Sequence, residues 1–155
     1  ALAIAGLAGC SGGGDGSDGS DGSDGSDGSG GSDGSDGSDG SATDAFEYTF
    51  GSNDDVTGSS LTGVRVNYPD GSGAVGDASM ASVTLAGDDV SDDLDGTSTS
   101  NNGSTLTFDF GGAYDVTADS ALSFELSGVA APDGSYTVET VVNPQSGATT
   151  FETSF

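Results

Sequence analysis

The sequence predicts an all-β fold, an antiparallel sandwich of about seven or eight strands over residues 42–155, behind an N-terminal region that we expect to be disordered. Two observations lead to this prediction. From Ala42 onward the apolar residues alternate along short runs, with the period of two that is typical of a half-buried strand. Turn signals rich in Gly, Asn and Pro separate these runs, as they do in small sandwiches, and no long window carries a helical stripe.

The predicted strands are the runs in which every second residue is apolar. In chain order they are centred on Phe46, Tyr48 and Phe50; Val64, Val66 and Tyr68; Val83 and Leu85; Leu106, Phe108 and Phe110; Leu122, Phe124 and Leu126; Tyr136 and Val138; and Phe151 and Phe155. All seven Phe residues fall in these runs, so we expect all of them to pack in the core. Glu47, Glu125, Glu139 and Glu152 occupy alternate positions and are expected on the solvated face.

The charge balance excludes several function classes. The chain has 155 residues, of which 26 are Asp or Glu, and Arg65 is the single cation, which gives a net charge of -25. Binding to nucleic acid needs clustered Lys and Arg, so we expect no nucleic-acid partner. Because His and Lys are absent and Cys occurs once, the chain cannot build Ser-His-Asp catalysis, a Schiff base or a His-ligated zinc site.

Residues 1–10 read ALAIAGLAGC and are interpreted as the end of a signal peptide. Leu7, Ala8 and Gly9 followed by Cys10 resemble a lipobox, the cleavage site after which the cysteine carries a lipid. A two-chain lipid on Cys10 would anchor the protein stably in a membrane. The run has no charged n-region, so we expect the start of the signal to precede residue 1. The alternative is a buried strand with a structural thiol.

Residues 11–41 consist almost entirely of an Asp-Gly-Ser repeat that contains eight Asp residues. A tract without apolar side chains cannot compensate its ordering entropy, so it is predicted to be a disordered, solvated linker. Calcium binding by the repeat is the alternative, but Asp at every third position does not match the spacing of known calcium loops. The other 18 acids lie in residues 42–155.

The combination of lipobox, acidic linker and Lys-free β-domain resembles the cell-surface lipoproteins of halophilic archaea. The stretch 134–147, GSYTVETVVNPQSG, is similar to a terminal hairpin of haloarchaeal secreted immunoglobulin-like domains. This resemblance implies an immunoglobulin-like sandwich held at the extracellular face of the cell membrane. Some proteins of this class are blue-copper carriers, but that centre needs two His and a free Cys, which this chain lacks.

One acidic stretch is a candidate cation site. Residues 88–96 read DDVSDDLDG, and the carboxylates of Asp88, Asp89, Asp93 and Asp95 are the type of ligand that calcium prefers. The stretch matches the EF-hand pattern only in part, because Ser91 occupies the first ligand position and Asn102 the last. The alternative is solvated surface charge of a halophile. No other cofactor is expected.

Asn102 begins the sequence Asn102-Gly103-Ser104, an acceptor pattern for N-glycosylation in a predicted turn. Asn-Gly is also an ordinary hairpin signal, so both interpretations stay open. Taken together, the residues predict a non-catalytic, lipid-anchored surface module for binding, adhesion or envelope structure, with an unknown extracellular partner. The alternative function is a calcium- or solute-binding receptor domain.

Overall fold

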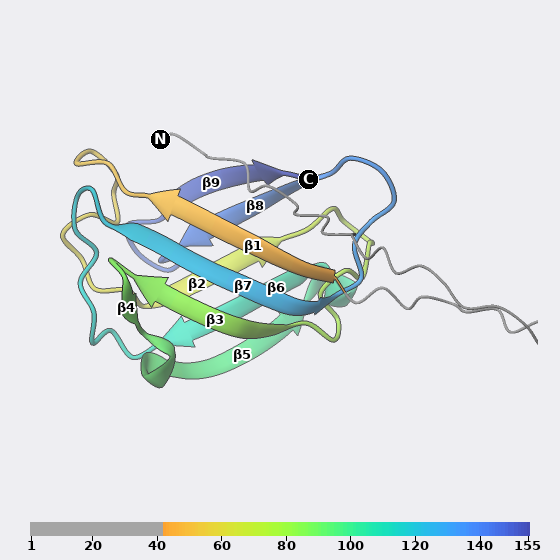
Figure 1. Cartoon of the computed structure of the whole chain (residues 1–155), viewed down its shortest axis with the longest axis horizontal. Coiled ribbons are helices and arrows are strands. Elements are labelled where there is room, and N and C mark those ends of the chain that lie inside the picture. Colours follow the sequence, from red (N-terminus) through yellow and green to blue (C-terminus); the bar gives the residue numbers. More distant parts are fainter. Residues whose placement is uncertain (1–41) are drawn as a thin grey trace, which may run out of the picture. The chain divides into compact units, whose positions relative to one another are not determined.

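The computed structural model describes residues 42–155, and these residues form a β-sandwich of two antiparallel sheets (Figure 1). Nine strands are present among them: β1 (Ala42–Thr49), β2 (Gly63–Asn67), β3 (Ser79–Leu85), β4 (Asp88–Asp89), β5 (Leu94–Ser100), β6 (Thr105–Phe110), β7 (Ala121–Val129), β8 (Thr137–Val142) and β9 (Thr149–Ser154). The helical content of this part is two short 3-10 turns, η1 (Ser91–Asp93) and η2 (Asn101–Gly103). The predicted all-β sandwich is therefore confirmed.

One sheet has four strands in the order β1-β7-β3-β4, and the other has five in the order β5-β6-β2-β8-β9. The edges β4 and β5 follow each other in the chain, with η1 between them. In β1 the burial alternates strictly from Asp44 to Phe50, which is the pattern expected when one face meets the core and the other meets water. No helix among residues 42–155 is long and apolar enough to cross a membrane.

The seven alternating runs all contribute to strands, but β4 and β5 were not predicted. β5 has the sequence LDGTSTS and lacks alternating apolar residues, because its residues are at least partly exposed on both faces. An edge strand of this kind is held by backbone hydrogen bonds to β6 and leaves no hydrophobic pattern in the sequence. The sandwich consequently has more strands than the pattern indicated.

The core between the sheets is aromatic. Phe46 stacks on Phe124 with ring centroids 4.8 Å apart, and Tyr48 stacks on Phe151 at 4.6 Å. The hydroxyl of Tyr48 bonds to Thr140 at 2.9 Å and to Thr153 at 2.8 Å, which satisfies it within the core.

Six of the seven Phe residues are buried, as predicted, but the prediction for Phe155 was wrong. Its side chain is 38% exposed, because it follows the end of β9 and packs on the rim of the core. There it stacks on Tyr136 with centroids 5.3 Å apart and meets Phe46 edge-on at 5.5 Å.

Candidate functional site

The antiparallel order sorts the loops into two groups at opposite ends of the sandwich (Figure 1). Ala42, where β1 begins, shares one end with the loops at 68–78, 101–104 and 130–136 and with the end of β9. The opposite end is formed by the loops at 50–62, 111–120 and 143–148 and by the connection at 86–93, which includes β4 and η1. We call this second group the distal loops. Leu7, Ala8, Gly9 and Cys10, the predicted lipobox, lie outside the described residues.

The distal loops carry many of the acids of the domain. They contain Asp54, Asp55, Asp88, Asp89, Asp92, Asp93, Asp115 and Asp119. Several of these carboxylates accept local hydrogen bonds: Asp54 from the Gly51 N–H at 2.7 Å and Asp115 from the Ser60 hydroxyl at 2.8 Å. Part of this charge therefore shapes the loops, in addition to being exposed to solvent.

The structure separates the four predicted calcium ligands into two pairs. Asp88 and Asp89 form β4, and Asp89 accepts a hydrogen bond from the Ser91 N–H at 2.9 Å. The hydroxyl and backbone N–H of Ser91 lower the pKa of Asp89 by stabilising its charged form.

Asp93 and Asp95 form the other pair, and both approach Gly111. One oxygen of Asp93 accepts the N–H groups of Gly112 and Ala113, each at 3.0 Å. A Cβ at Gly111 would lie 2.7 Å from Asp93 Oδ1 and 3.4 Å from Asp95 Oδ2, so a larger residue here would displace the Asp93 carboxylate. In the part of the chain that the structure describes, no group of three or more His, Cys, Asp or Glu residues is placed to hold a metal ion. Calcium binding by this stretch stays a prediction.

Asn102 lies in the connection between β5 and β6, as the turn signal indicated. Its backbone is left-handed with φ of 54°, Gly103 follows with φ of 80°, and the Asn102 side chain is exposed. The neighbouring Asn101 links this loop to the loop at 68–78, because its amide donates a 2.6 Å hydrogen bond to Asp70. An exposed Asn in a hairpin loop is geometrically accessible, and its glycosylation stays a prediction.

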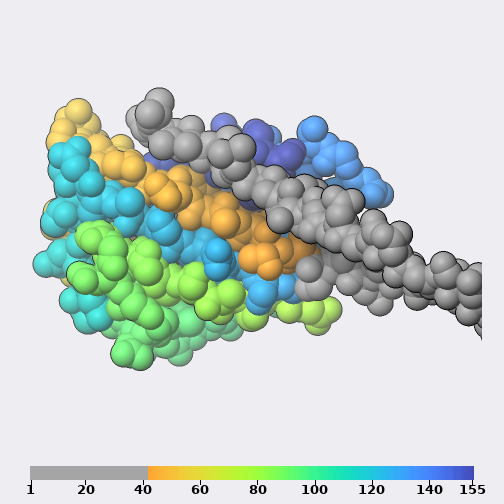
Figure 2. Space-filling model, in the orientation of Figure 1, coloured from red at the N-terminus to blue at the C-terminus, as the bar shows by residue number. Residues whose placement is uncertain are grey.

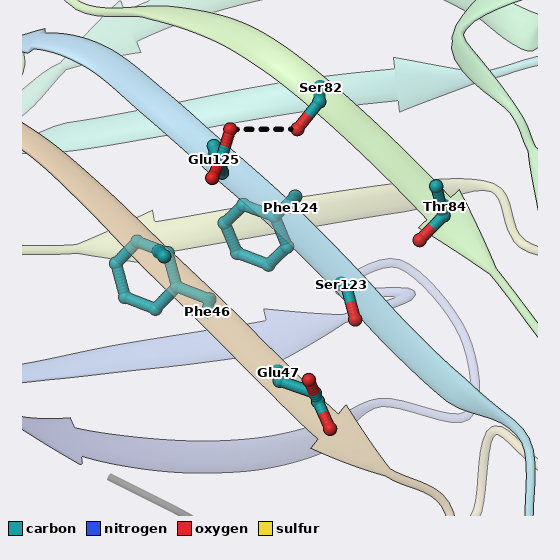
Figure 3. A pocket seen from close by; sticks show the side chains of 8 residues that line it. Phe46, Glu47, Ser82, Thr84, Ser123, Phe124 and Glu125 are labelled. Carbon is teal, nitrogen blue, oxygen red and sulfur yellow. Dashed lines mark hydrogen bonds between the residues drawn. The ribbon is translucent and has the colours of Figure 1, made fainter. Parts of the chain in front are cut away.

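An open depression of about 370 Å³ lies on the outer face of the four-stranded sheet. Figure 2 shows β1, β7 and β3 side by side on the face toward the viewer, and Figure 3 shows the side chains of the depression. Glu47 comes from β1, Ser123 and Glu125 from β7, and Ser82 and Thr84 from β3.

The depression offers carboxylate and hydroxyl oxygens on one surface. Ser82 donates a 3.2 Å hydrogen bond to Glu125, and Glu47 lies directly across the strand pair from Ser123. Because Ala45 faces Glu125, the two glutamates occupy diagonal positions on neighbouring strands. Such oxygens can bind hydroxyl groups or cations. Both glutamates are exposed, as predicted from the strand pattern.

A buried carboxylate near the start of β1 was missed by the sequence reasoning. Asp44 is 6% exposed and faces the core, where it accepts hydrogen bonds from the hydroxyl of Tyr68 at 2.5 Å and that of Tyr136 at 3.3 Å. Burial and the nearby negative charge raise the pKa of Tyr136 to about 12 and that of Tyr68 further above its usual value. The only signal was an acid at an inward position of an alternating run.

Asn143 is a second buried polar residue that the sequence reasoning left in a turn. It is 2% exposed with φ of 53°, and its amide oxygen accepts the N–H and the hydroxyl of Thr62 at 2.8 and 3.1 Å. Its amide nitrogen donates to the Ser60 carbonyl at 2.8 Å. Asn143 thereby joins the β8–β9 connection to residues 59–63, and it orders two of the distal loops.

Comparisons with known proteins do not identify a relative. No protein-family description, no curated protein and no solved structure matches the chain.

Proposed function

We propose that this chain is a lipid-anchored, non-catalytic module at the extracellular face of a halophile's cell membrane, which serves binding, adhesion or envelope structure. The observation that carries the proposal is the direction of the chain through the sandwich. The segment that would link Cys10 to the domain joins β1 at Ala42, and the distal loops lie at the opposite end. Loops placed away from an anchor are the part of a sandwich most available to partners.

The surface charge supports a saline environment. Residues 42–155 carry 18 acids and one cation, Arg65, and most of these acids are exposed. At an ionic strength of about 1 M the Debye length is about 3 Å, so repulsion among such charges is largely screened. In dilute buffer the same charges repel across the whole domain, which destabilises the compact state.

The available side chains favour binding over catalysis. Glu47 and Glu125 are the acids of the depression on the four-stranded sheet, and both are exposed on an open sheet face. The chain has no His or Lys to position a substrate or move a proton beside them. We therefore propose no enzymatic role.

The anchor is tested by membrane fractionation of a halophilic host that expresses the chain behind a lipoprotein signal peptide. The parent protein should fractionate with membranes and yield a lipid-modified N-terminal Cys10 by mass spectrometry. Cys10→Ser should release it into the medium. Ser11→Ala, next to the lipidated position, is the matched control and should leave the protein on the membrane. An unmodified mature chain that starts elsewhere would overturn the proposal.

The saline setting is tested separately with the purified chain. Circular dichroism should show loss of β structure on dialysis from molar salt into dilute buffer, and readdition of salt should restore it. Unchanged spectra in dilute buffer would contradict the halophilic part of the proposal and leave the anchor untouched.

The depression on the four-stranded sheet supports a second candidate, a calcium- or solute-binding receptor domain. A calcium titration followed by thermal melting distinguishes it from a structural module. A ligand that binds the folded state alone raises the melting temperature. If the depression binds calcium, Glu125→Gln should remove the shift and Glu152→Gln, on the other sheet, should keep it. If the 88–96 stretch binds calcium, Asp93→Asn should remove it instead. No shift at millimolar calcium eliminates the calcium form of this candidate.

A further inference from the structure

The sandwich has four edge strands, and three of them carry features that discourage pairing with another strand. β4 is two residues long and consists of Asp88 and Asp89. β1 has an irregular register between Ala42 and Asp44 and carries Glu47, and β9 carries Glu152. Short length, bulges and charges are the usual protection of sheet edges.

β5 is the exception. Its register with β6 is irregular between Leu94 and Gly96 and regular from there to Ser100, and the regular part has the uncharged sequence GTSTS. Thr97 to Ser100 are all exposed, including Thr97 and Thr99 on the side of the strand that faces the other sheet. The four-stranded sheet therefore does not cover this part of β5, which Figure 1 shows along the margin of the domain.

The hydrogen-bond pattern identifies the backbone groups that point away from the domain. In β6, Phe110 donates its N–H to Thr62 on the β2 side, and Ser104 accepts from Tyr68 on the same side. The backbone N–H and C=O groups of the even-numbered residues of β6 therefore point to β2, and those of the odd-numbered residues point to β5. The reason is that the direction of these groups alternates from one residue to the next along a strand. Thr105 and Thr107 pair with Ser100 and Ser98.

It follows that the N–H and C=O groups of Thr97 and Thr99 point to the open edge. Thr97 and Thr99 lie opposite Phe108 and Leu106, whose own backbone groups face β2. The open edge thus presents two donors and two acceptors at the spacing of an antiparallel ladder.

We propose that this edge pairs with the β5 strand of a second copy of the chain, antiparallel and about a twofold axis at Ser98. In this register Thr97 of each copy lies opposite Thr99 of the other, and all four outward groups of each strand are paired. Ser98 lies opposite its own counterpart, and the two five-stranded sheets become one continuous sheet. A twofold interface of this kind is closed and self-complementary.

The distribution of charge supports a second copy as the occupant. The acids next to β5 lie near its beginning: Asp92, Asp93, Asp95, and Asp109, which is opposite Gly96 on β6. The rest of the strand is neutral. Antiparallel pairing places the acidic starts of the two strands at opposite ends, so no carboxylates face each other in the regular part. Pairing through an edge alone buries little surface, so the association is expected to be weak and to need screening salt.

Disulfide trapping tests the register. Ser98→Cys in a Cys10→Ser background leaves one thiol per chain, and residues opposite each other in a non-hydrogen-bonded pair have Cα atoms at a distance that a disulfide spans. Oxidised glutathione serves as the oxidant: two protein thiols form one disulfide, and the glutathione disulfide takes up the two electrons and two protons. In molar salt this covalent dimer should form about tenfold faster than a dimer between thiols that meet only by free collision. Thr150→Cys, an exposed outward position on the edge strand β9, provides that reference.

Two further variants separate pairing from folding. Thr99→Pro in the Ser98→Cys background removes a backbone N–H that points to the open edge and leaves every hydrogen bond to β6 in place. This variant should form the disulfide no faster than Thr150→Cys does. Its circular dichroism spectrum should be the same as that of the parent chain. Ser98→Glu, which places like charges opposite each other, should reduce the fraction of dimer seen by sedimentation of the otherwise unaltered chain. Trapping of Ser98→Cys no faster than Thr150→Cys overturns the proposal. So does rapid trapping that a folded Thr99→Pro variant retains.

Discussion

Replacing Tyr68 with Phe removes one oxygen atom from the core, together with the shorter of the two hydrogen bonds to the buried carboxylate of Asp44. That bond is 2.5 Å long, and Tyr68 is 3% exposed. The remaining donor, the hydroxyl of Tyr136, lies 3.3 Å away. Arg65, the one cation of the chain, occupies an outward position of β2, between the inward residues Val64 and Val66. Its side chain therefore does not neutralise the Asp44 carboxylate from within the core.

The expected loss follows from the class of bond. A hydrogen bond to a charged group contributes roughly 1.5–3 kcal/mol to the free energy of unfolding. Removing the bond costs more when it leaves a buried acceptor without a good partner. We therefore expect Tyr68→Phe to lower the free energy of unfolding by about 2–3 kcal/mol. For a domain of this size that corresponds to a melting temperature lower by about 10 °C or more.

Tyr136→Phe is the matched comparison, because it removes the same atom from the longer bond of a partly exposed ring. Tyr136→Phe should lower the free energy of unfolding by less than about 1 kcal/mol. Thermal and urea unfolding in high salt, with circular dichroism as the signal, measures both variants. In an Asp44→Asn background the cost of Tyr68→Phe should fall, since the bond no longer ends on a charge. Equal losses for the two tyrosines would refute this account of Asp44.

Three other predictions concern single sites. Ala86 has φ of 56° in the two-residue turn between β3 and β4, a left-handed conformation that Asn adopts more readily than Ala. Ala86→Asn should therefore stabilise the domain by about 0.5–1 kcal/mol in thermal unfolding. A loss of stability would show that the turn does not demand this conformation. Glu139 and Glu152 lie directly opposite each other on β8 and β9. Glu152→Gln should therefore raise the melting temperature more at the lowest ionic strength at which the domain is still folded than in molar salt, and an equal effect at both ionic strengths would argue against repulsion. The pKa of Tyr136 is raised to about 12 and that of Tyr68 is also raised, so the folded state holds these two protons more tightly than the unfolded state. Their contribution to stability is therefore complete below pH 10 and is lost as pH rises through 12 and above. A titration of phenolate absorbance in the parent chain, Tyr68→Phe and Tyr136→Phe checks this, and ionisation of Tyr68 or Tyr136 near pH 10 in the folded chain would contradict it.

The strands that the sequence predicted are those whose side chains report burial directly. Phe46, Leu106 and Phe124 lie in runs where every second residue meets the core, and this periodicity is visible without knowledge of any partner strand. β5 was missed because its contacts are made by the backbone, which every residue shares. Phe155 was misassigned because its run continues past the end of β9 to the rim of the core.

The loops were the weakest part of the prediction. Val56, Leu61 and Val116 are fully buried, although they lie between strands in segments rich in Gly, Ser and Asp. Their burial depends on the way in which the distal loops fold over the end of the sandwich. A single apolar residue in such a segment has no periodicity, so its sequence context does not distinguish a core residue from an exposed one.

The candidate sites show the same division. The acidic stretch 88–96 was identified correctly as dense in carboxylates, but it divides between β4, η1 and the start of β5. Asp93 turned out to bind backbone N–H groups of residues 112 and 113, and those partners are distant in the sequence. Conversely, nothing in the composition distinguished Asp44 from the 17 other acids of residues 42–155.

The fold class, the seven hydrophobic strands and the excess of acid over base follow from the sequence, because side-chain period and formal charge are properties of the chain alone. The environment of each carboxylate was decided by the assembled sheets: Asp44 under two tyrosine hydroxyls, Glu139 opposite Glu152, and Glu125 beside Ser82. Strand order also made β5 an edge and exposed both of its faces. Pairing partners and edges arise only when distant segments meet, and the free energy of a buried or paired charge depends on those neighbours.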